Sequence, residues 1–393
     1  MASDGKFGGR EVVIVEAVRT PVGRGHEEKG YYKDLHPSNL LARTFSELVS
    51  RAGIDPAEVE DVVSGCVQQF GEQGFNIGRN AWLEAGLPVT TPATTIDRQC
   101  GSAQQAVNFA AALIASGVHD VAIGGGVEHM GRISFADGMA VQQEHGFAFS
   151  PQLMERYNLV PQGISAEMIA DKWEIPRSEL DEIGLRSHQL AHQATEEGRF
   201  EREIVPISVN GDTYVTDQGI RPDTSLEKLA ELKPAFKEDG KITAGNSSQI
   251  SDGAAAVLLM TREKAEAHGL RPRARVVDQT TVGVDPVLML TGPIPATQLL
   301  LNRNGMKIDD VDLIEINEAF ASVIAAWRRE IEPDMDRVNV NGGAIAIGHP
   351  LGSTGARLIT TLLYELERSD REVGLVTMCC GGGLGTGTII ERV

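Results

Sequence analysis

The stretch GIDPAEVEDVV at residues 53–63 returns later in the chain as GMKIDDVDLIE at residues 305–315. Both copies predict a helix that ends at the glycine, a turn, and then a strand. Two further matches follow in the same order. They are small-residue helices opened by residues 101–103 and 352–356, and apolar runs leading into glycines at residues 120–126 and 374–383. Three matches in one order indicate two copies of one α/β unit.

The segment between the two copies differs in character. Helices with small residues on all sides are poor solvent-facing amphipaths, so we expect each copy's helix to lie between sheets. Prolines from Pro151 to Pro234 instead punctuate short helical stretches such as residues 178–197, which indicates an insertion over the core. The predicted division is a first half at 1–123, a loop domain at 124–245, a return to the first half at 246–272, and a second half at 273–393.

Composition narrows the class of protein. The chain has 393 residues, 41% of them apolar, and a formal charge of -19, which opposes loose binding to nucleic acid or anionic lipid. Apolar runs such as residues 254–260 fall short of the roughly 20 residues of a membrane helix, and residues 1–10 lack the apolar core of a signal peptide. We therefore expect a cytoplasmic protein without nucleic-acid or membrane partners. The four cysteines (Cys66, Cys100, Cys379, Cys380) are too few for a disulfide scaffold and lack zinc-site spacing, so we expect free thiols and no metal.

Two residues lie at the openings of the repeated helices. Cys100 directly precedes the first small-residue helix, where unpaired N–H groups and the helix dipole favour a thiolate over a thiol. That position suits a nucleophile, although an inert buried cysteine is an equally ordinary interpretation. Gly348-His349-Pro350 opens the equivalent helix, so His349 lies near the pseudo-symmetric position of Cys100. Two face-to-face copies can bring such a nucleophile and base together.

Two further motifs follow strands of the second copy. Cys379-Cys380-Gly381-Gly382-Gly383 comes after the apolar run 374–378, where loop N–H groups can point at an oxyanion. A nucleotide-phosphate loop would need a following Gly-Lys-Ser/Thr, and a vicinal disulfide would be strained. Asn317 ends the strand expected at 312–316 and either holds a water or substrate oxygen or caps the next helix.

The four motifs together resemble the signature blocks of the thiolases in order and spacing, over about residues 11–393: Cys100-Gly101-Ser102, Asn317-Glu318-Ala319-Phe320, Gly348-His349-Pro350 and Cys379-Cys380-Gly381-Gly382-Gly383. The resemblance implies a duplicated, five-layered αβαβα fold whose loop domain covers the active site, and a homodimer or homotetramer. It implies cleavage of 3-ketoacyl-CoA by CoA into acetyl-CoA and a shortened acyl-CoA. CoA is then a co-substrate, and no cofactor is permanently bound.

The resemblance also implies how the reacting groups divide the chemistry. Cys100 would carry the acyl group in a ping-pong transfer, and His349 would activate it. Cys379 would protonate departing acetyl-CoA and deprotonate incoming CoA. A cysteine with its ordinary pKa of about 8.5 exchanges a proton almost isoenergetically with an alkyl thiol such as that of CoA.

Oxyanion and CoA contacts are implied in the same way. One oxyanion hole would consist of His349 with a water held by Asn317, and the other of the backbone N–H groups of Cys100 and Gly381. Ser248 and Arg221 match positions that contact CoA. Arg221 also begins a segment, residues 221–241, that is locally neutral on an acidic chain, although a solvated helix face has the same composition.

One departure from the family pattern bears on the substrate. Short-chain biosynthetic thiolases carry a His-Met pair before a Gly-Ile-Thr-Ala-Glu-like stretch, whereas here Val160-Pro161-Gln162 precedes residues 163–167. This favours a degradative enzyme that accepts larger chains, including bulky sterol side chains. The alternatives are a biosynthetic acetoacetyl-CoA thiolase, a condensing enzyme of the ketoacyl-synthase kind with His or Asn in place of Cys379, and a non-catalytic CoA or lipid carrier.

Overall fold

The computed structural model describes residues 9–393. Residues 1–8, which the predicted first half and the expectation about a signal peptide both include, lie outside the described residues. The first half of the chain contributes β1 (Val12–Arg19), β2 (Gly23–Arg24), α1 (Pro37–Ala52), β3 (Asp61–Gly65), α2 (Ile77–Glu84), β4 (Ala93–Ile96), α3 (Ser102–Ala115), β5 (Val121–His129), β8 (Ser251–Thr261) and α9 (Arg262–Ala267).

The remaining elements belong to the second half and to the insertion. The second half contributes β9 (Ala274–Gly283), α10 (Pro293–Asn304), β10 (Leu313–Ile316), α11 (Ala321–Ile331), α12 (Thr354–Arg368), β11 (Val373–Cys380) and β12 (Leu384–Arg392). The insertion lies between β5 and β8 and contributes α4 (Phe135–His145), α5 (Pro151–Arg156), α6 (Gln162–Lys172), α7 (Arg177–Glu196), β6 (Ile207–Val209), β7 (Asp212–Tyr214) and α8 (Leu226–Ala230).

The predicted internal repeat is confirmed element by element. Helix α1 ends at Gly53 with φ 68°, and α10 ends at Gly305 with φ 64°. Each glycine occupies the left-handed conformation that stops a helix without a Cβ clash. A short 3₁₀ turn then leads into β3 in the first copy and into β10 in the second. The local signals in the two stretches therefore specify the same turn twice.

The two copies join into one ten-stranded sheet with the order β10-β11-β12-β9-β1-β8-β5-β3-β4, and β2 also pairs with β8. The copies meet at the β1–β9 pair, which is short: Val13 lies opposite Arg275, and Ile14 lies opposite Ala274. Each copy contains one parallel pair, β3 with β5 and β10 with β11. A further strand, β8 or β12, runs antiparallel to the second member of that pair. This arrangement places the same βαβ unit on both sides of the junction.

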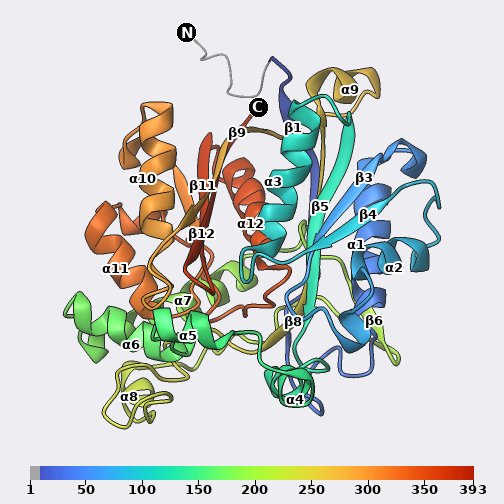
Figure 1. Cartoon of the computed structure of the whole chain (residues 1–393). Coiled ribbons are helices and arrows are strands. Elements are labelled where there is room, and N and C mark those ends of the chain that lie inside the picture. Colours follow the sequence, from blue (N-terminus) through green and yellow to red (C-terminus); the bar gives the residue numbers. More distant parts are fainter. Residues whose placement is uncertain (1–8) are drawn as a thin grey trace.

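Five layers follow from the alternation of side chains along the strands. On β1, Val13 and Val15 pack outward under α1 and α2, whereas Val12 and Ile14 pack inward against α3 and α12. A third buried cluster lies between the second copy's strands and the helices α10 and α11. Figure 1 shows the result from the side, with α3 and α12 between the two groups of strands. The expected αβαβα architecture is confirmed.

The central helices cross closely because one of them carries a glycine at the contact. A Cβ built on Gly355 of α12 would lie 2.3 Å from the backbone nitrogen of Gln104 on α3. Any side chain there forces the helices apart. The expectation that both small-residue helices are sandwiched is therefore met by direct helix–helix contact.

The insertion leaves the sheet later than the sequence indicated. Strand β5 continues to His129, which pairs with Asp252 of β8, so the boundary predicted at 123/124 falls inside a strand. The apolar pattern that ends at the glycines Gly124–Gly126 hid this continuation. In Figure 1 the helices α4, α5, α6 and α8 lie along one edge of the core, below the strands. Across residues 9–393, no helix has the length and apolarity to cross a membrane.

Candidate active site

A cavity of about 500 Å³ lies where both halves and the insertion meet. Cys100 comes to it from the loop before α3, and His349 comes from the loop before α12. The other walls are mainly apolar and include Met130, Phe135, Phe236, Phe320 and Leu351. The structure therefore brings the predicted nucleophile and the predicted base to one largely apolar cavity.

Cys100 is buried, with 2% of its surface exposed. Burial raises the pKa of its thiol to about 11, even though the N–H groups of Gly381 and of Cys100 itself act in the opposite direction. The expectation that the helix N-terminus makes Cys100 a thiolate is therefore wrong. Desolvation of the charged form outweighs the dipole. The thiol carries its proton at neutral pH and needs a base to become a nucleophile.

His349 supplies a nitrogen that can take that proton. Burial and the nearby positive charge of Arg357 lower its pKa to about 3, so the ring is neutral. Its Nδ1 lies 2.7 Å from the Thr354 hydroxyl, and that hydroxyl donates its own proton to the carbonyl oxygen of Pro350 at 2.8 Å. Thr354 must then accept from Nδ1–H, which leaves Nε2 with its lone pair.

The position of His349 differs from the prediction. Helix α12 begins at Thr354, so His349 lies in the preceding loop and does not open the helix. Its backbone N–H donates to the Ser251 hydroxyl at 3.1 Å, and Ser251 begins β8 of the first half. Because both halves hold the histidine, pseudo-symmetry with Cys100 is only approximate.

Asn317 lies beside His349 and does not cap a helix. Its backbone N–H donates to the carbonyl of Thr377 at 3.1 Å, and its Nδ2 lies 3.3 Å from His349 Nε2. Helix α11 begins at Ala321 with Phe320 at the N-cap, so the capping interpretation is wrong. The Oδ1 atom of Asn317 is buried and has no hydrogen-bond partner among the residues that the structure describes.

The adjacent cysteines Cys379 and Cys380 lie on opposite faces of β11. Cys379 belongs to the outer cluster with Leu375, whereas Cys380 belongs to the central cluster with Cys100. Burial raises the pKa of both thiols, and the negative charge of an ionised Cys100 raises each further. The sequence suggested that the pKa of Cys379 matches that of an ordinary alkyl thiol, whereas burial raises it well above that value. All four cysteines of the chain are free.

Gly381 follows these cysteines at the start of the turn between β11 and β12. A Cβ there would lie 2.8 Å from Gln162 Nε2 and 3.1 Å from Gln99 Oε1. A side chain there would displace both glutamine side chains, whereas the backbone N–H of Gly381 faces the Cys100 sulfur. The turn therefore contributes backbone, not a side chain, to the site.

The two predicted CoA contacts differ in their position relative to the cavity. Ser248 lines the cavity, whereas Arg221 is exposed and does not. The backbone N–H of Arg221 donates to Nδ1 of His188 on α7 at 3.1 Å. Lysines of the same segment pair with carboxylates, Lys228 with Asp223 at 2.7 Å for example. The Arg221 guanidinium forms no ion pair with any residue from 9 to 393.

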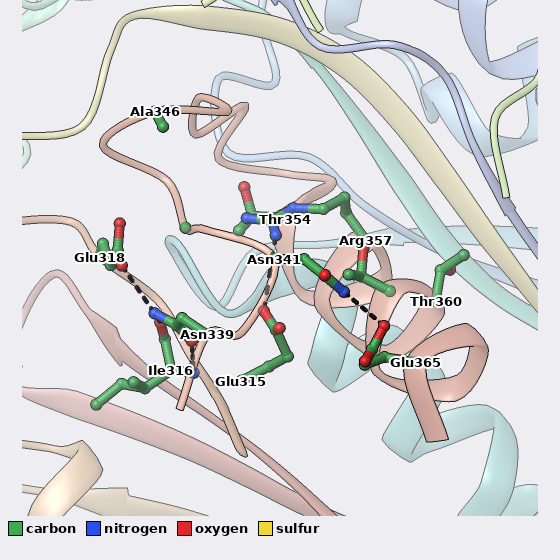
Figure 2. A network of polar contacts seen from close by, with 12 residues as sticks. Glu315, Ile316, Glu318, Asn339, Asn341, Ala346, Thr354, Arg357, Thr360 and Glu365 are labelled. Carbon is green, nitrogen blue, oxygen red and sulfur yellow. Dashed lines mark hydrogen bonds and ion pairs between the residues drawn. The ribbon is translucent and has the colours of Figure 1, made fainter. Parts of the chain in front are cut away.

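Several residues of the site carried no sequence signal. Gln99, directly before Cys100, has φ 50°, a left-handed conformation that is uncommon outside glycine and often marks functional strain. Thr354 follows His349 by five positions and fixes its tautomer. Behind the site, Glu318 accepts from Asn339 Nδ2 at 2.9 Å and from the hydroxyl of Ser187, on α7 of the insertion, at 2.6 Å (Figure 2 shows the Asn339 contact). These contacts join segments far apart in the chain.

Comparison with known protein families decides which reaction class this geometry serves. Residues 12–263 match the model "Thiolase, N-terminal domain" and residues 270–392 match "Thiolase, C-terminal domain". The chain belongs to the thiolase family. The matches extend over both halves, which confirms the prediction from the four motifs. As a thiolase with relatives that are thiolases and an acetyltransferase, this protein is an acyltransferase.

Curated relatives cover nearly the whole chain. Steroid 3-ketoacyl-CoA thiolase FadA6 of Mycobacterium tuberculosis is 47% identical over 98% of this chain and 94% of its own length. A 3-ketoacyl-CoA thiolase of Psychrobacter cryohalolentis is 45% identical over 98% of both chains. Among solved structures, the Bacillus anthracis acetyl-CoA acetyltransferase aligns with a TM-score of 0.89 at 39% identity, covering 98% of this chain and 99% of that one.

Proposed function

We propose that this thiolase cleaves 3-ketoacyl-CoA with CoA, releasing acetyl-CoA and a shortened acyl-CoA, and that Cys100 carries the acyl group between the two steps. The observation that carries the proposal is the shared cavity: a buried, protonated thiol and a neutral imidazole whose Nε2 carries the lone pair line the same apolar space. The names of the relatives support the degradative direction.

In the first half-reaction the Cys100 proton passes to Nε2 of His349, and the sulfur attacks the 3-keto carbon of the substrate. The carbon–sulfur bond forms as the bond between C2 and C3 breaks. Acetyl-CoA leaves as its enolate and takes a proton on C2 from the Cys379 thiol. Burial keeps that thiol protonated at neutral pH, which suits its role as the acid.

In the second half-reaction the thiol of CoA gives its proton to the Cys379 thiolate. The resulting CoA thiolate attacks the acyl group on Cys100, and Cys100 leaves with the proton held by His349. Each group then has its starting proton again. Two cysteines and one histidine are sufficient for both steps, so the mechanism needs no permanently bound cofactor.

Charge that develops on oxygen needs preorganised donors, each of which contributes roughly 3–4 kcal/mol in such sites. We assign one oxyanion site to the N–H groups of Cys100 and Gly381, which already face the Cys100 sulfur. We assign the other to Asn317 and His349, whose side chains lie 3.3 Å apart. A water held by Asn317 completes the second site in this proposal.

We propose that the acyl group is larger than acetyl. A cavity of about 500 Å³ falls within the roughly 300–1,000 Å³ of pockets that hold drug-sized ligands, and its walls are mainly apolar. A relative whose name specifies a steroid substrate is consistent with such a group. The test is a thiolysis screen over short, long, branched and sterol-derived 3-ketoacyl-CoAs. A kcat/KM maximum at acetoacetyl-CoA would favour the alternative of a short-chain biosynthetic enzyme.

The proposed carrier role of Cys100 has a direct test. The enzyme is incubated with acyl-CoA, quenched in acid, and the acyl adduct is mapped by mass spectrometry. We expect the adduct on Cys100 in the wild type and none in Cys100→Ala. An adduct on Cys66 or Cys380 alone contradicts the assignment. If the enzyme releases no acetyl-CoA from a 3-ketoacyl-CoA and CoA, the alternative of a non-catalytic carrier is favoured.

We propose that the insertion binds CoA through Ser248 and Arg221. An exposed guanidinium without an ion-pair partner in residues 9–393 suits a phosphate on a chain of charge -19. Arg221→Glu should raise the CoA concentration for half-saturation more than it lowers turnover at saturation. Lys307→Glu makes the same charge change and is the matched control. Lys307 precedes the short turn that leads into β10 and does not line the cavity. Equal effects of both variants contradict this site.

We also propose a homo-oligomer, a dimer or tetramer. Strand β4 is the end strand of the sheet on the first half's side, so its outer edge is free to pair with a second copy. Light scattering of the purified protein measures the mass directly, and a monomer at micromolar concentration contradicts the proposal.

A further inference from the structure

A buried carboxylate links the two halves of the chain beside the active site. Glu128 of β5 is fully buried, and both of its oxygens accept hydrogen bonds. Its Oε2 accepts the backbone N–H groups of Val67 and Gly352, each at 2.9 Å. Its Oε1 accepts the backbone N–H of Gln68 at 3.1 Å and an N–H of Gln73 Nε2 at 2.8 Å. Gly352 belongs to the second half, whereas the other donors belong to the first.

These donors require the ionised form of the carboxyl group. A carboxylate offers about four lone-pair positions on its two oxygens, so a proton on either oxygen would displace one of the N–H groups. Burial raises the pKa of Glu128, and the N–H groups of Val67 and Gln68 act in the opposite direction. Hydrogen bonds to an ionised acceptor are stronger than those between neutral groups. Glu128 therefore links these segments strongly and with a defined direction.

Gly352 lies in the turn that carries the proposed base. The carbonyl oxygen of Pro350 accepts the backbone N–H groups of Ser353 and Thr354, each at 3.0 Å, and the Thr354 hydroxyl at 2.8 Å. That hydroxyl in turn accepts from Nδ1 of His349 at 2.7 Å. The segment from His349 to Thr354 is thus one hydrogen-bonded unit, so a displacement of Gly352 also displaces the imidazole.

This turn packs against the first half without room for a side chain. A Cβ on Gly352 would lie 2.3 Å from the carbonyl oxygen of Val127. A Cβ on Gly126 would lie 2.0 Å from the carbonyl oxygen of Gly352, and one on Gly65 would lie 2.7 Å from it. Glycine at these positions lets the backbone of the second half reach β3 and β5. Glu128 supplies the charged contact at the same junction.

Both segments that Glu128 links contribute to the wall of the cavity. Val67 lines the cavity, and so does Leu351, which directly precedes Gly352. Cys100 and His349 line the same cavity, whereas Glu128 is not among its lining residues. Any effect of Glu128 on the reaction therefore passes through the segments that it holds.

We propose that Glu128 is a positioning residue: its carboxylate fixes the turn at Gly352 against the loop after β3, so that Nε2 of His349 faces the Cys100 thiol. This inference rests on the proposed role of His349 as the base. Without the carboxylate, donors from both halves lose their common acceptor and the turn moves away from the first half. Transfer of the Cys100 proton to Nε2 then slows.

The charge of Glu128 acts on Cys100 in the opposite direction. Burial is the main cause that raises the pKa of the Cys100 thiol, and the negative charge of Glu128 is a smaller one. Loss of the charge alone would therefore make the thiolate easier to form and would speed its alkylation. Slower alkylation in a variant without the carboxylate thus indicates a lost position and not a lost charge.

Glu128→Gln tests the inference with almost no change of shape. In either orientation of the amide, its NH₂ group faces two N–H donors. The experiment measures the rate constant for alkylation of Cys100 by iodoacetamide at pH 7, with the adduct counted by mass spectrometry. The S–C bond forms as the C–I bond breaks, iodide leaves, and the thiol proton passes to His349. We expect a fall of about 10- to 100-fold, because a misplacement of about 1 Å can cost about 100-fold.

Stability is separated from this effect by a matched variant. Asp278 of β9 is also buried, and it accepts the backbone N–H of Gln279 and an N–H of Asn304 Nδ2, each at 2.8 Å, beside α10. Asp278→Asn should lower Tm and leave the rate constant unchanged. A wild-type or faster rate constant in Glu128→Gln overturns the inference. If Glu128→Gln does not fold, Glu128→Asp replaces it: the shorter side chain cannot reach donors from both halves, and an unchanged or faster rate constant overturns the inference as well.

His349→Gln distinguishes failure of the inference from failure of the proposed function. Wild-type alkylation of Cys100 in His349→Gln means that His349 is not the base, which removes the basis of both. If His349→Gln is slow, the double variant Glu128→Gln/His349→Gln decides. We expect it to be no slower than His349→Gln, because Glu128 acts through His349. A double variant slowed by the product of the two single effects means that Glu128 acts independently of His349, and it overturns the inference while His349 remains the base.

Discussion

Thr354→Val tests whether one hydroxyl decides which ring nitrogen of His349 carries the proton. Valine has nearly the shape of threonine but accepts no hydrogen bond. In the wild type the hydroxyl accepts from Nδ1–H at 2.7 Å and donates to the Pro350 carbonyl at 2.8 Å. Removing it leaves a buried N–H without an acceptor, while the packing at the start of α12 stays almost unchanged.

The magnitude follows from the cost of that orphaned donor, about 1–3 kcal/mol. The other tautomer, with the proton on Nε2, avoids this cost because Asn317 Oδ1 has no partner within the described residues and a flipped amide can accept from it. The equilibrium between tautomers therefore moves by about 5- to 150-fold toward the form that cannot take a proton on Nε2. We expect kcat/KM for thiolysis to fall by about the same factor.

The assay compares kcat/KM for a 3-ketoacyl-CoA, the CoA concentration for half-saturation, and the alkylation rate of Cys100, at pH 7. Thr354→Val should lower the first and last together and leave CoA half-saturation unchanged. Thr354→Ser retains the hydroxyl and should stay within about 2-fold of the wild type. A Thr354→Val enzyme with more than half of wild-type kcat/KM refutes the argument that Thr354 sets the tautomer.

Three further predictions follow from the same geometry. The Cys379→Ala enzyme should still be acylated on Cys100 but lose about 10²- to 10⁴-fold in turnover. Cys380→Ala changes the opposite face of β11 and should lower turnover only slightly. The reverse result in steady-state kinetics means that the sequence of the turn is aligned one residue off. Phe236→Ala enlarges the cavity and should lower kcat/KM for short acyl groups by about 10-fold relative to bulky ones, while Phe75→Ala, 97% exposed, should not; an unchanged ratio of the two kcat/KM values excludes Phe236 as a wall of the acyl site. Burial and Arg221 lower the pKa of His188 from 6.5 to about 4, so the unfolded chain takes up a proton as the pH falls through this window and the folded chain does not, and stability is lost toward acid. His188→Gln should flatten the dependence of Tm on pH between these values, and an unchanged slope contradicts a neutral buried His188.

The repeat shows what local sequence signals can predict. Gly53 and Gly305 end their helices in the left-handed conformation, and both are followed by the expected turn and strand. These signals act over a few residues, so the helix ends can be predicted correctly without knowledge of the rest of the chain. The boundary at 123/124 was wrong because glycines usually punctuate loops. In β5 they continue a buried strand through His129.

Errors at the site have one physical origin. The helix opening beside Cys100 favours a thiolate locally, but burial raises the pKa of the thiol to about 11. The sequence predicted that His349 opens a helix, but α12 begins only at Thr354, so His349 lies in the loop before it. Ser251 of the other half accepts the backbone N–H of His349 and helps to hold that loop. In both cases the surroundings of the residue in the folded chain, and not its local sequence, decide its state or its support.

The sequence by itself determined the duplication, the layered α/β class, the thiolase family, and the identity of the reactive side chains, because periodicity, helix ends and motif order are properties of short segments. Only the tertiary structure decided that Cys100 is a protonated thiol and that Nε2 of His349, beside Asn317, is the ring nitrogen without a proton. Protonation depends on desolvation and on charges a few ångströms away. Those neighbours come from β8, β10 and α12, which the folded chain brings together.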